Sequence, residues 1–342
     1  MLRILENYSL LSHNSFGLDV KAHTFVEYDS VESLQEYVKY ETAKPLLHIG
    51  GGNNLLFTKD FSGTILHSDI KGKQLITDAD SAMDGVGRAP YVMLRVGAAE
   101  MWDNLVAWCL ANGYYGMENL SLIPSEVGAA AVQNIGAYGA EAKDFISTVD
   151  AVDLTTGETV VLSNAECQFA YRYSNFKGPW VGHYAITYVT FCLPTVFKPN
   201  LTYRALQQVV SSVFDAHQIR QTVVDMRRSK LPEPSDLGNA GSFFMNPVMT
   251  LEQFSAIQHD YPDVPHFFVG EGDVKIPAAW LIEQTGWKGK NLGRAGVYEL
   301  QPLVLVNRGG ATPDDIVALA ARIMDDVQQK FGISLKPEVI YI

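Results

Sequence analysis

The chain has 342 residues, of which 47% are hydrophobic and 19% charged, a composition typical of globular proteins with two or three domains. Its formal net charge of -12 argues against nucleic acid or an anionic membrane as a general partner, because a surface that is negative on average repels polyanions. Cys109, Cys167 and Cys192 are odd in number and form no Cys-x-x-Cys pair, so we expect reduced thiols and no zinc site. We also expect neither a signal peptide nor a membrane span, because no apolar run is long enough.

The first part of the chain is predicted to begin with a strand, a helix and a second strand. The first strand is expected at 24–27 and the helix at 31–40, where Asp29 and Glu32 have the spacing of a helix start. The second strand is expected at 45–49. This order resembles a βαβ unit.

A glycine-rich loop, Gly-Gly-Gly-Asn-Asn at 50–54, follows this second strand, and 63–67 is predicted to be a further strand. Backbone N–H groups in such a loop can bind a pyrophosphate. The loop is not a dinucleotide-binding Rossmann fingerprint, because Leu55 takes the place of the third glycine and no acidic residue is evidently placed to hold a ribose.

The middle of the chain is predicted to be mostly strands, interrupted by one helix. Strands are expected at 91–96, 149–154, 158–162 and 185–191. The helix is indicated by apolar residues at helical spacing between Trp102 and Leu110, and Gly113 suits its C-terminal end. Its apolar face is expected to pack in the core.

A segment of small residues at 122–140 follows this helix and is expected to be a loop. It is almost free of charge and carries Gly128, Gly136 and Gly139, so its backbone can lie against a flat ligand without intervening side chains. A tight turn and a buried strand packed with small residues are the alternative interpretation. Together with the first glycine loop, the segment suggests a large ligand that carries phosphate.

The last part is predicted to contain helices and one domain boundary. Helices are expected at 218–229, 251–257, 277–284 and 312–331, and a short strand at 303–306. The sequence Leu-Pro-Glu-Pro at 231–234 ends the first of these helices and marks the boundary. Thr250 with Gln253 has the pattern of a capping box.

Five motifs occur in order along nearly the whole chain. They are the two glycine-containing segments, Tyr171-Arg-Tyr-Ser174, Gly238-Asn-Ala-Gly-Ser-Phe-Phe-Met-Asn-Pro247 and Lys336-Pro-Glu-Val-Ile-Tyr-Ile342. This set resembles the UDP-N-acetylenolpyruvoylglucosamine reductases, which are flavoenzymes of cell-wall precursor synthesis. The resemblance implies an α+β fold, with a two-part FAD-binding domain of the vanillyl-alcohol-oxidase or PCMH type and a smaller α+β substrate-binding domain.

The resemblance also implies a division of the chain by residue order. Residues 1–73 and 74–226 would form the two FAD-binding subdomains, with the PCMH-type domain at about 17–197. Residues 227–335 would form the substrate-binding domain, and 336–342 a C-terminal strand that carries a catalytic glutamate.

The reaction implied is the NADPH-dependent reduction of UDP-N-acetyl-3-O-(1-carboxyvinyl)-glucosamine to UDP-N-acetylmuramate, with non-covalent FAD as the hydride carrier and NADPH and substrate using one cleft in turn. In this resemblance Ser242 donates the proton, and Arg172 and Glu338 stabilise the enolate. A guanidinium stays protonated and its planar fork suits a carboxylate. By residue type alone, each has an ordinary alternative: a turn serine, a surface ion pair and a solvated tail carboxylate.

FAD is expected to contact both glycine-containing segments. The residues implied for cofactor binding are Gly50, Gly51, Gly52, Asn53, Asn54, Ile123, Gly128, Asn134, Gly136, Tyr138 and Arg227. Those implied for substrate binding are Tyr203, Lys230, Asn246, Lys275 and Gln301, and no metal is expected. Tyr203 marks the longer of two family types, in which a tyrosine-bearing loop folds over the substrate. The chain departs from the common pattern at Ser125, where glycine is frequent, and at Asn53, where serine is frequent.

The resemblance implies a small-molecule partner only, a UDP-sugar enolpyruvyl ether, and a cytoplasmic monomer without nucleic-acid or membrane partners. One alternative is an FAD-dependent sugar or alcohol oxidase of the same fold. Such oxidases often attach flavin through a histidine after the first glycine pair, whereas His48 precedes the glycines here. The other alternative is a non-catalytic flavin or sugar-nucleotide binding module, which the joint presence of Ser242, Arg172 and Glu338 disfavours.

Overall fold

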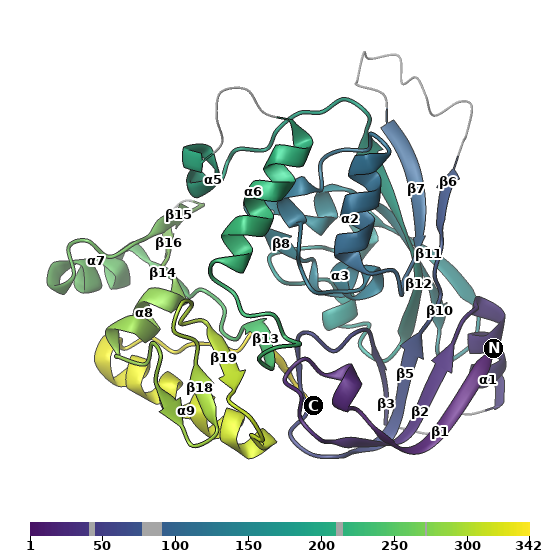
Figure 1. The fold of residues 1–342 in the computed structure, drawn as a ribbon, viewed down its shortest axis with the longest axis horizontal. Coiled ribbons are helices and arrows are strands. Elements are labelled where there is room, and N and C mark those ends of the chain that lie inside the picture. Colours follow the sequence, from purple (N-terminus) through teal and green to yellow (C-terminus); the bar gives the residue numbers. More distant parts are fainter. Residues whose placement is uncertain (41–44, 77–90, 210–214, 271) are drawn as a thin grey trace. The chain divides into compact units, whose positions relative to one another are not determined.

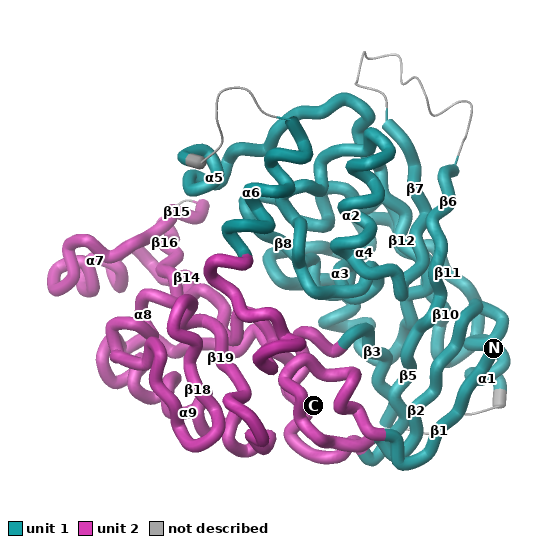
Figure 2. Tube along the Cα trace, in the orientation of Figure 1, with its two compact units in different colours: residues 1–8, 22–51, 62–227 teal, residues 9–21, 52–61, 228–342 magenta. Residues whose placement is uncertain are grey.

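The computed structural model describes residues 1–40, 45–76, 91–209, 215–270 and 272–342. Figure 2 shows its two compact units, which interleave along the chain. Unit 1 contains residues 1–8, 22–51 and 62–227, and unit 2 contains 9–21, 52–61 and 228–342. The glycine loop therefore passes from unit 1 to unit 2 between Gly51 and Gly52, and the division by residue order into four parts stays a prediction.

The first sheet of unit 1 has the strand order β1-β2-β5-β3, visible in Figure 1. Its strands are β1 (Leu2–Ser9), β2 (Lys21–Tyr28), β3 (Leu46–Ile49) and β5 (Phe61–Ser68). Helix α1 (Val31–Tyr40) connects β2 to β3, and β3 pairs parallel with β5. The predicted strand–helix–strand order is confirmed, although Ser30 rather than Asp29 accepts the hydrogen bond from the backbone N–H of Ser33 at the helix start.

The second sheet of unit 1 is antiparallel, with the order β11-β10-β12-β7-β6. Its strands are β6 (Lys73–Ile76), β7 (Tyr91–Gly97), β10 (Ile146–Asp153), β11 (Thr159–Ser163) and β12 (Tyr184–Pro194). Helices α2 (Trp102–Ala111) and α3 (Val127–Gln133) lie along it in Figure 1, and their apolar side chains join the core formed by β7, β10 and β12. The predicted core face of α2 is confirmed, because Trp102, Leu105 and Cys109 are buried.

The small-residue segment contains a helix, where the sequence predicted a loop. Helix α3 forms because its alanines have the highest helix propensity. Gly128 is placed where an added Cβ would lie 3.0 Å from the Cβ of Ala98, so the glycine permits close packing on the sheet. Asn134, at φ 45, ends the helix, and β8 (Gly136–Ala137) and β9 (Ala140–Glu141) form a short hairpin after it.

The remaining helices of unit 1 are the single-turn α4 (Asn164–Cys167), α5 (Arg204–Val209) and α6 (Ala216–Arg228). Buried residues Leu206, Ile219 and Val223 pack α5 against α6, and Tyr138 lies against the same cluster. Helix α6 thus contacts the hairpin that follows α3. Short 3-10 helices occur at Leu11–His13, Glu118–Leu120, Ala142–Asp144 and Asn175–Lys177.

Unit 2 is built around a sheet of order β13-β19-β18-β17, covered by α8 and α9 (Figure 1). The strands are β13 (Asn239–Ser242), β17 (Asn291–Leu292), β18 (Ala295–Val297) and β19 (Val304–Asn307), and the helices are α8 (Ala278–Gln284) and α9 (Pro313–Phe331). Pro277, expected in the first turn of α8, precedes the helix as its N-cap. A smaller sheet of order β14-β16-β15 packs with α7; their bounds are β14 (Val248–Thr250), β15 (Phe267–Val269), β16 (Asp273–Lys275) and α7 (Leu251–Asp260).

Within the tail 336–342, where a strand was expected, Ile340–Tyr341 form a short strand in unit 2, and Glu338 precedes it. Strand β20 (Ile340–Tyr341) pairs parallel with β4 (Leu55–Leu56), directly after the glycine loop. Among the helices that the structure describes, none is both long and apolar enough to cross a membrane.

Candidate functional site

The first glycine loop owes its shape to Gly52. Its φ is 66°, and an added Cβ would lie 1.9 Å from the carbonyl oxygen of His13, so only glycine fits. Gly51, Asn53 and Asn54 are half-buried. The side chain of Asn54 donates to the carbonyl oxygen of Glu338 at 3.2 Å, and Ile340 N–H donates to the carbonyl oxygen of Asn54 at 3.0 Å. Within unit 2, the end of the loop is therefore bonded to the tail segment that carries Glu338.

Ser242 and Glu338 lie on neighbouring backbone segments of unit 2. Strand β13 has an irregular register against β19 between Asn239 and Ser242, where Gly241 has φ 70°. The backbone N–H of Glu338 donates to the carbonyl oxygen of Phe243 at 2.8 Å. Both predicted residues are half-buried. The predicted glutamate, Glu338, is thus bonded through its backbone to the residue that follows Ser242, the predicted proton donor. Both residues belong to unit 2.

Arg172 belongs to unit 1 and stands at a tight turn. Ala170 and Tyr173 exchange backbone hydrogen bonds of 3.0 Å, and Arg172 between them has φ 55°, a conformation that costs energy for a residue with a Cβ. Its Nη2 donates to the carbonyl oxygen of Gly136 at 2.9 Å. Since a Cβ at Gly136 would lie 3.1 Å from Arg172 Nη1, the glycine gives the guanidinium room.

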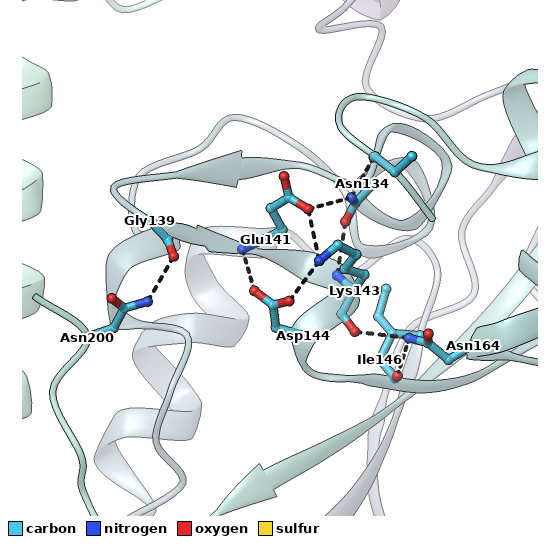
Figure 3. Close-up of polar contacts among 9 residues, drawn as sticks. Asn134, Gly139, Glu141, Lys143, Asp144, Ile146, Asn164 and Asn200 are labelled. Carbon is cyan, nitrogen blue, oxygen red and sulfur yellow. Dashed lines mark hydrogen bonds and ion pairs between the residues drawn. The ribbon is translucent and has the colours of Figure 1, made fainter. Parts of the chain in front are cut away.

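Asn134 is fully buried, and its amide bonds to its own chain (Figure 3). Its Nδ2 donates to Glu141 Oε2 at 3.1 Å and to the carbonyl oxygen of Ala170 at 2.8 Å, and its Oδ1 accepts from the N–H of Lys143 at 3.0 Å. This side chain joins the end of α3 to the β8–β9 hairpin and to the turn that carries Arg172.

Tyr138 and Tyr203 meet edge to face, with ring centroids 5.2 Å apart. Tyr138, at φ 49°, and Gly139, at φ 85°, form the turn of the hairpin. The loop before Tyr203 is fastened to this turn, because Asn200 Nδ2 donates to the carbonyl oxygen of Gly139 at 2.9 Å (Figure 3). Asn119 Nδ2 donates to the carbonyl oxygens of Tyr138 and Asn200 at 2.7 and 2.9 Å. Tyr203 itself stays 41% exposed.

Sequence reasoning missed Asn119 and Asn200, the asparagines that hold this tyrosine loop. Asn200 stands three residues before Tyr203 and follows Pro199, a turn signal that could have indicated it. Asn119 had no local signal, because its partners are distant in sequence. Burial raises the pKa of the Tyr138 hydroxyl above its ordinary value, so this hydroxyl is protonated at neutral pH.

The predicted substrate residues of unit 2 have varied surroundings. Asn246 Oδ1 accepts the backbone N–H of Ala278 at 2.9 Å, at the start of α8. Gln301 is half-buried in the turn before β19, where its carbonyl oxygen accepts from the N–H of Val304 at 3.0 Å. Lys230 is exposed, and the ammonium of Lys275 lies 6.0 Å from the ring centre of Phe267.

The remaining cofactor candidates lie in unit 1. Ile123 and Arg227 are half-buried, and Arg227 Nε donates to the carbonyl oxygen of Leu122 at 3.1 Å. A Cβ at Gly50 would lie 2.9 Å from Oε2 of Glu126, the end of a flexible side chain, and 3.1 Å from the Cβ of Ala129. Both Gly50 and Gly128 are therefore packed closely within unit 1, with their backbone uncovered by side chains of their own. The described ranges contain no group of three or more His, Cys, Asp and Glu that could hold a metal.

Two family models match separate parts of the chain. Residues 22–163 match an FAD binding domain, and residues 233–342 match the C-terminal domain of UDP-N-acetylenolpyruvoylglucosamine reductase. The α+β fold class and the FAD-binding domain expected from the sequence are confirmed. A solved structure of UDP-N-acetylenolpyruvylglucosamine reductase from Thermus caldophilus has the same fold, with a TM-score of 0.67 at 21% identity, over 100% of this chain and 98% of that one.

Curated relatives align with almost the whole chain. The UDP-N-acetylenolpyruvoylglucosamine reductase of Bacteroides fragilis (strain YCH46) is 46% identical over 98% of this chain and 99% of its own length. The reductase of Porphyromonas gingivalis (strain ATCC 33277) is 46% identical over 99% of both chains. That of Burkholderia ambifaria is 41% identical over 100% of this chain and 97% of its own. The protein therefore belongs to the UDP-N-acetylenolpyruvoylglucosamine reductase family.

Proposed function

We propose that this protein reduces UDP-N-acetyl-3-O-(1-carboxyvinyl)-glucosamine to UDP-N-acetylmuramate, with FAD as its non-covalent cofactor and NADPH as the reductant, in peptidoglycan precursor synthesis. The observation that carries the proposal is the match to reductases of this name over 98% of the chain at 46% identity. The match of residues 22–163 to an FAD binding domain supports the cofactor.

FAD supplies hydride transfer when it is bound, and the residues of the chain orient the reactants and handle the proton and the charge. The backbone at Gly50, Gly51 and Gly52, followed by Asn53 and Asn54, would bind the pyrophosphate through N–H groups. Residues of unit 1 would complete the cofactor site, either by contacting FAD or by holding the backbone that contacts it. They are Ile123, Gly128, Asn134, Gly136, Tyr138 and Arg227.

Reduction of the enol ether adds a hydride to the methylene carbon and a proton to the adjacent carbon, which bears the carboxylate. We assign the proton to the Ser242 hydroxyl, which stands at the irregular end of β13. Arg172 would pair with the substrate carboxylate and, with Glu338, stabilise the enolate. The positive φ of Arg172 supports this role, because backbone strain in folded proteins gathers at functional sites.

Substrate recognition is assigned to Tyr203, Lys230, Asn246, Lys275 and Gln301. The exposed side chain of Tyr203, on a loop fastened by Asn200, suits contact with a ligand that enters from solvent. Lys230 and Lys275 offer positive charge to a diphosphate in a protein whose net charge is -12.

The two half-reactions test the function directly. Purified protein is reduced with NADPH without oxygen, while the visible absorption of oxidised flavin is followed, and the enolpyruvyl substrate is then added. Rapid return of the absorption, with formation of UDP-N-acetylmuramate, is the expected result. Return of the absorption only after air is admitted would favour the sugar or alcohol oxidase. Binding of flavin or of the UDP-sugar without any turnover would favour the non-catalytic module, and absence of flavin binding would refute the cofactor assignment.

We propose in addition that the protein is a cytoplasmic monomer that acts on a small molecule, without nucleic-acid or membrane partners. The three cysteines are free thiols, which suits a reducing compartment. Light scattering of a size-separated sample would show a mass near 37.7 kDa for a monomer, and about twice that mass would contradict it.

A further inference from the structure

The peptide that precedes Ile123 in unit 1 has an unusual backbone. Leu122 has φ 57°, in the left-handed region where the Cβ of an L-residue crowds the backbone. Such a conformation persists only when its surroundings hold it. The contacts of Leu122 therefore indicate which residues set the backbone at this point.

Both polar backbone groups of Leu122 are held by charged side chains. Asp103, in the first turn of α2, accepts the N–H of Leu122 at 2.5 Å through Oδ1. Arg227, near the end of α6, donates from Nε to the carbonyl oxygen of Leu122 at 3.1 Å. In an ordinary turn, the N–H and the carbonyl oxygen would bond to water or to other backbone groups. Hydrogen bonds to charged side chains are shorter and stronger than those.

A second arginine of α6 fixes Asp103. Arg220 Nη1 donates to Asp103 Oδ1 at 2.6 Å and Nη2 to Oδ2 at 2.9 Å, which is a bidentate pair. The Arg220 and Asp103 side chains are only 19% and 28% exposed. Burial would raise the pKa of Asp103, but the hydrogen bonds from Arg220 and Leu122 and the charges of Arg220 and Arg227 outweigh it and lower this pKa. The carboxylate is therefore ionised at neutral pH.

The flanks of Leu122 are held by other means. Trp102 Nε1 donates to the carbonyl oxygen of Leu120 at 2.9 Å, and Trp102 N–H donates to that of Ser125 at 2.9 Å. These bonds join the segment to α2 alone. The charged chain from Arg220 through Asp103 to Leu122, together with Arg227, joins it to α6 as well.

We propose that Asp103 and Arg220 are positioning residues of the cofactor site. Asp103 on α2, held by Arg220 on α6, keeps the Leu122 peptide in its left-handed conformation and so fixes the backbone at Ile123. The inference rests on the proposed function, which places Ile123 against FAD. Neither Asp103 nor Arg220 is assigned any contact with the cofactor or the substrate.

The test measures FAD affinity, which does not depend on turnover. Apoprotein is titrated with FAD by fluorescence, and thermal unfolding is followed by circular dichroism on the same samples. Asp103→Asn is expected to weaken FAD binding by about tenfold to a hundredfold, because a charge-assisted network that holds a strained peptide is lost. The matched control is Asp150→Asn, which breaks the Arg95–Asp150 pair of unit 1, with an Nε to Oδ2 distance of 2.7 Å and side chains 30% and 18% exposed. The control is expected to change affinity by less than about twofold.

A second substitution separates positioning from loss of stability. Glycine adopts positive φ without the Cβ penalty, so Asp103→Asn combined with Leu122→Gly is expected to recover most of the lost affinity. Equal affinity of Asp103→Asn and the wild type would overturn the proposal. So would a loss of affinity that Leu122→Gly leaves unchanged.

If Asp103→Asn does not fold, Arg220→Lys takes its place, because it keeps the charge but loses the bidentate geometry. It is expected to weaken FAD binding severalfold, and unchanged affinity would overturn the proposal. Failure of the wild-type protein itself to bind FAD would instead refute the proposed function. The two failures are therefore distinguishable.

Discussion

Gly52→Ala should destabilise the protein through two separable effects. Gly52 is the last of the three glycines in the first loop and has φ 66°. An added Cβ would lie 1.9 Å from the carbonyl oxygen and 3.0 Å from a Cα of the His13–Asn14 segment, which belongs to the same unit. Because these are backbone atoms, no side-chain rotation can relieve the overlap.

The size of the effect follows from the two costs. A residue with a Cβ in the left-handed region costs about 1–2 kcal/mol. Relief of an overlap in packed surroundings costs about 1–3 kcal/mol more, because backbone must shift. We therefore expect Gly52→Ala to lower the free energy of unfolding by about 2–5 kcal/mol.

Gly17 provides a matched control in the same unit. Its φ is 64°, and an added Cβ would meet nothing within 4 Å, so Gly17→Ala should show the conformational cost alone, about 1–2 kcal/mol. Urea unfolding of both variants, followed by far-ultraviolet circular dichroism, gives the two values. Equal losses in the two variants, or a loss below about 1 kcal/mol for Gly52→Ala, would refute the steric reasoning.

Three further predictions concern the chemistry, a helix end and the half-buried His48. Ser242→Ala should lower turnover of the enolpyruvyl substrate by about 10²–10⁴-fold and leave flavin reduction by NADPH unchanged; stopped-flow absorption measures both, and full turnover would remove Ser242 from the mechanism. Thr312→Ala should cost about 1 kcal/mol in urea unfolding, because Thr312 Oγ1 accepts from the N–H of Asp315 at 3.3 Å, and Thr312→Ser should restore most of it. Burial, and to a lesser extent the charge of His67, lower the pKa of His48 to about 3. Unfolding therefore takes up a proton below about pH 6.5. The free energy of unfolding should fall by up to about 1.4 kcal/mol per pH unit as the pH drops from there toward pH 3. His48→Gln should remove that slope, and an unchanged slope in urea unfolding between about pH 4 and pH 7 would contradict the assignment.

Elements with complete local signals were predictable from the sequence. Helix α9 has a capping box of Thr312 and Asp315 at its start, Pro313 in its first turn and Gly332 at φ 69° as its end. Each signal acts within a few residues, so no distant contact is needed to read it. Ile316, Leu319, Ile323 and Val327, which recur at helical spacing, are buried.

Helix α3 shows why composition misled at the small-residue segment. Gly128 and the alanines were interpreted as a loop that exposes its backbone, but the glycine instead permits the helix to approach Ala98, directly after β7. Composition alone favours helix and loop about equally for this segment, and packing within the folded unit favours the helix. A strand in the tail was predicted, but its partner β4 was not, because pairing between segments so distant in sequence depends on the whole fold.

Three asparagines expected to contact ligands are bonded to their own chain. Both Nδ2 hydrogens of Asn134 are accounted for by Glu141 and Ala170, Asn54 donates to the Glu338 carbonyl oxygen, and Asn246 caps α8. An amide has two donor hydrogens and one acceptor oxygen, so each internal bond reduces what the side chain can offer to a ligand. The resemblance implies ligand contacts at these positions, whereas the bonds show side chains that fix the turn or helix end around them. The same reasoning applies to Asp103, which bonds to Leu122. Groups that shape a binding surface often lie beneath it and act through a single hydrogen bond, so only the three-dimensional contacts reveal them.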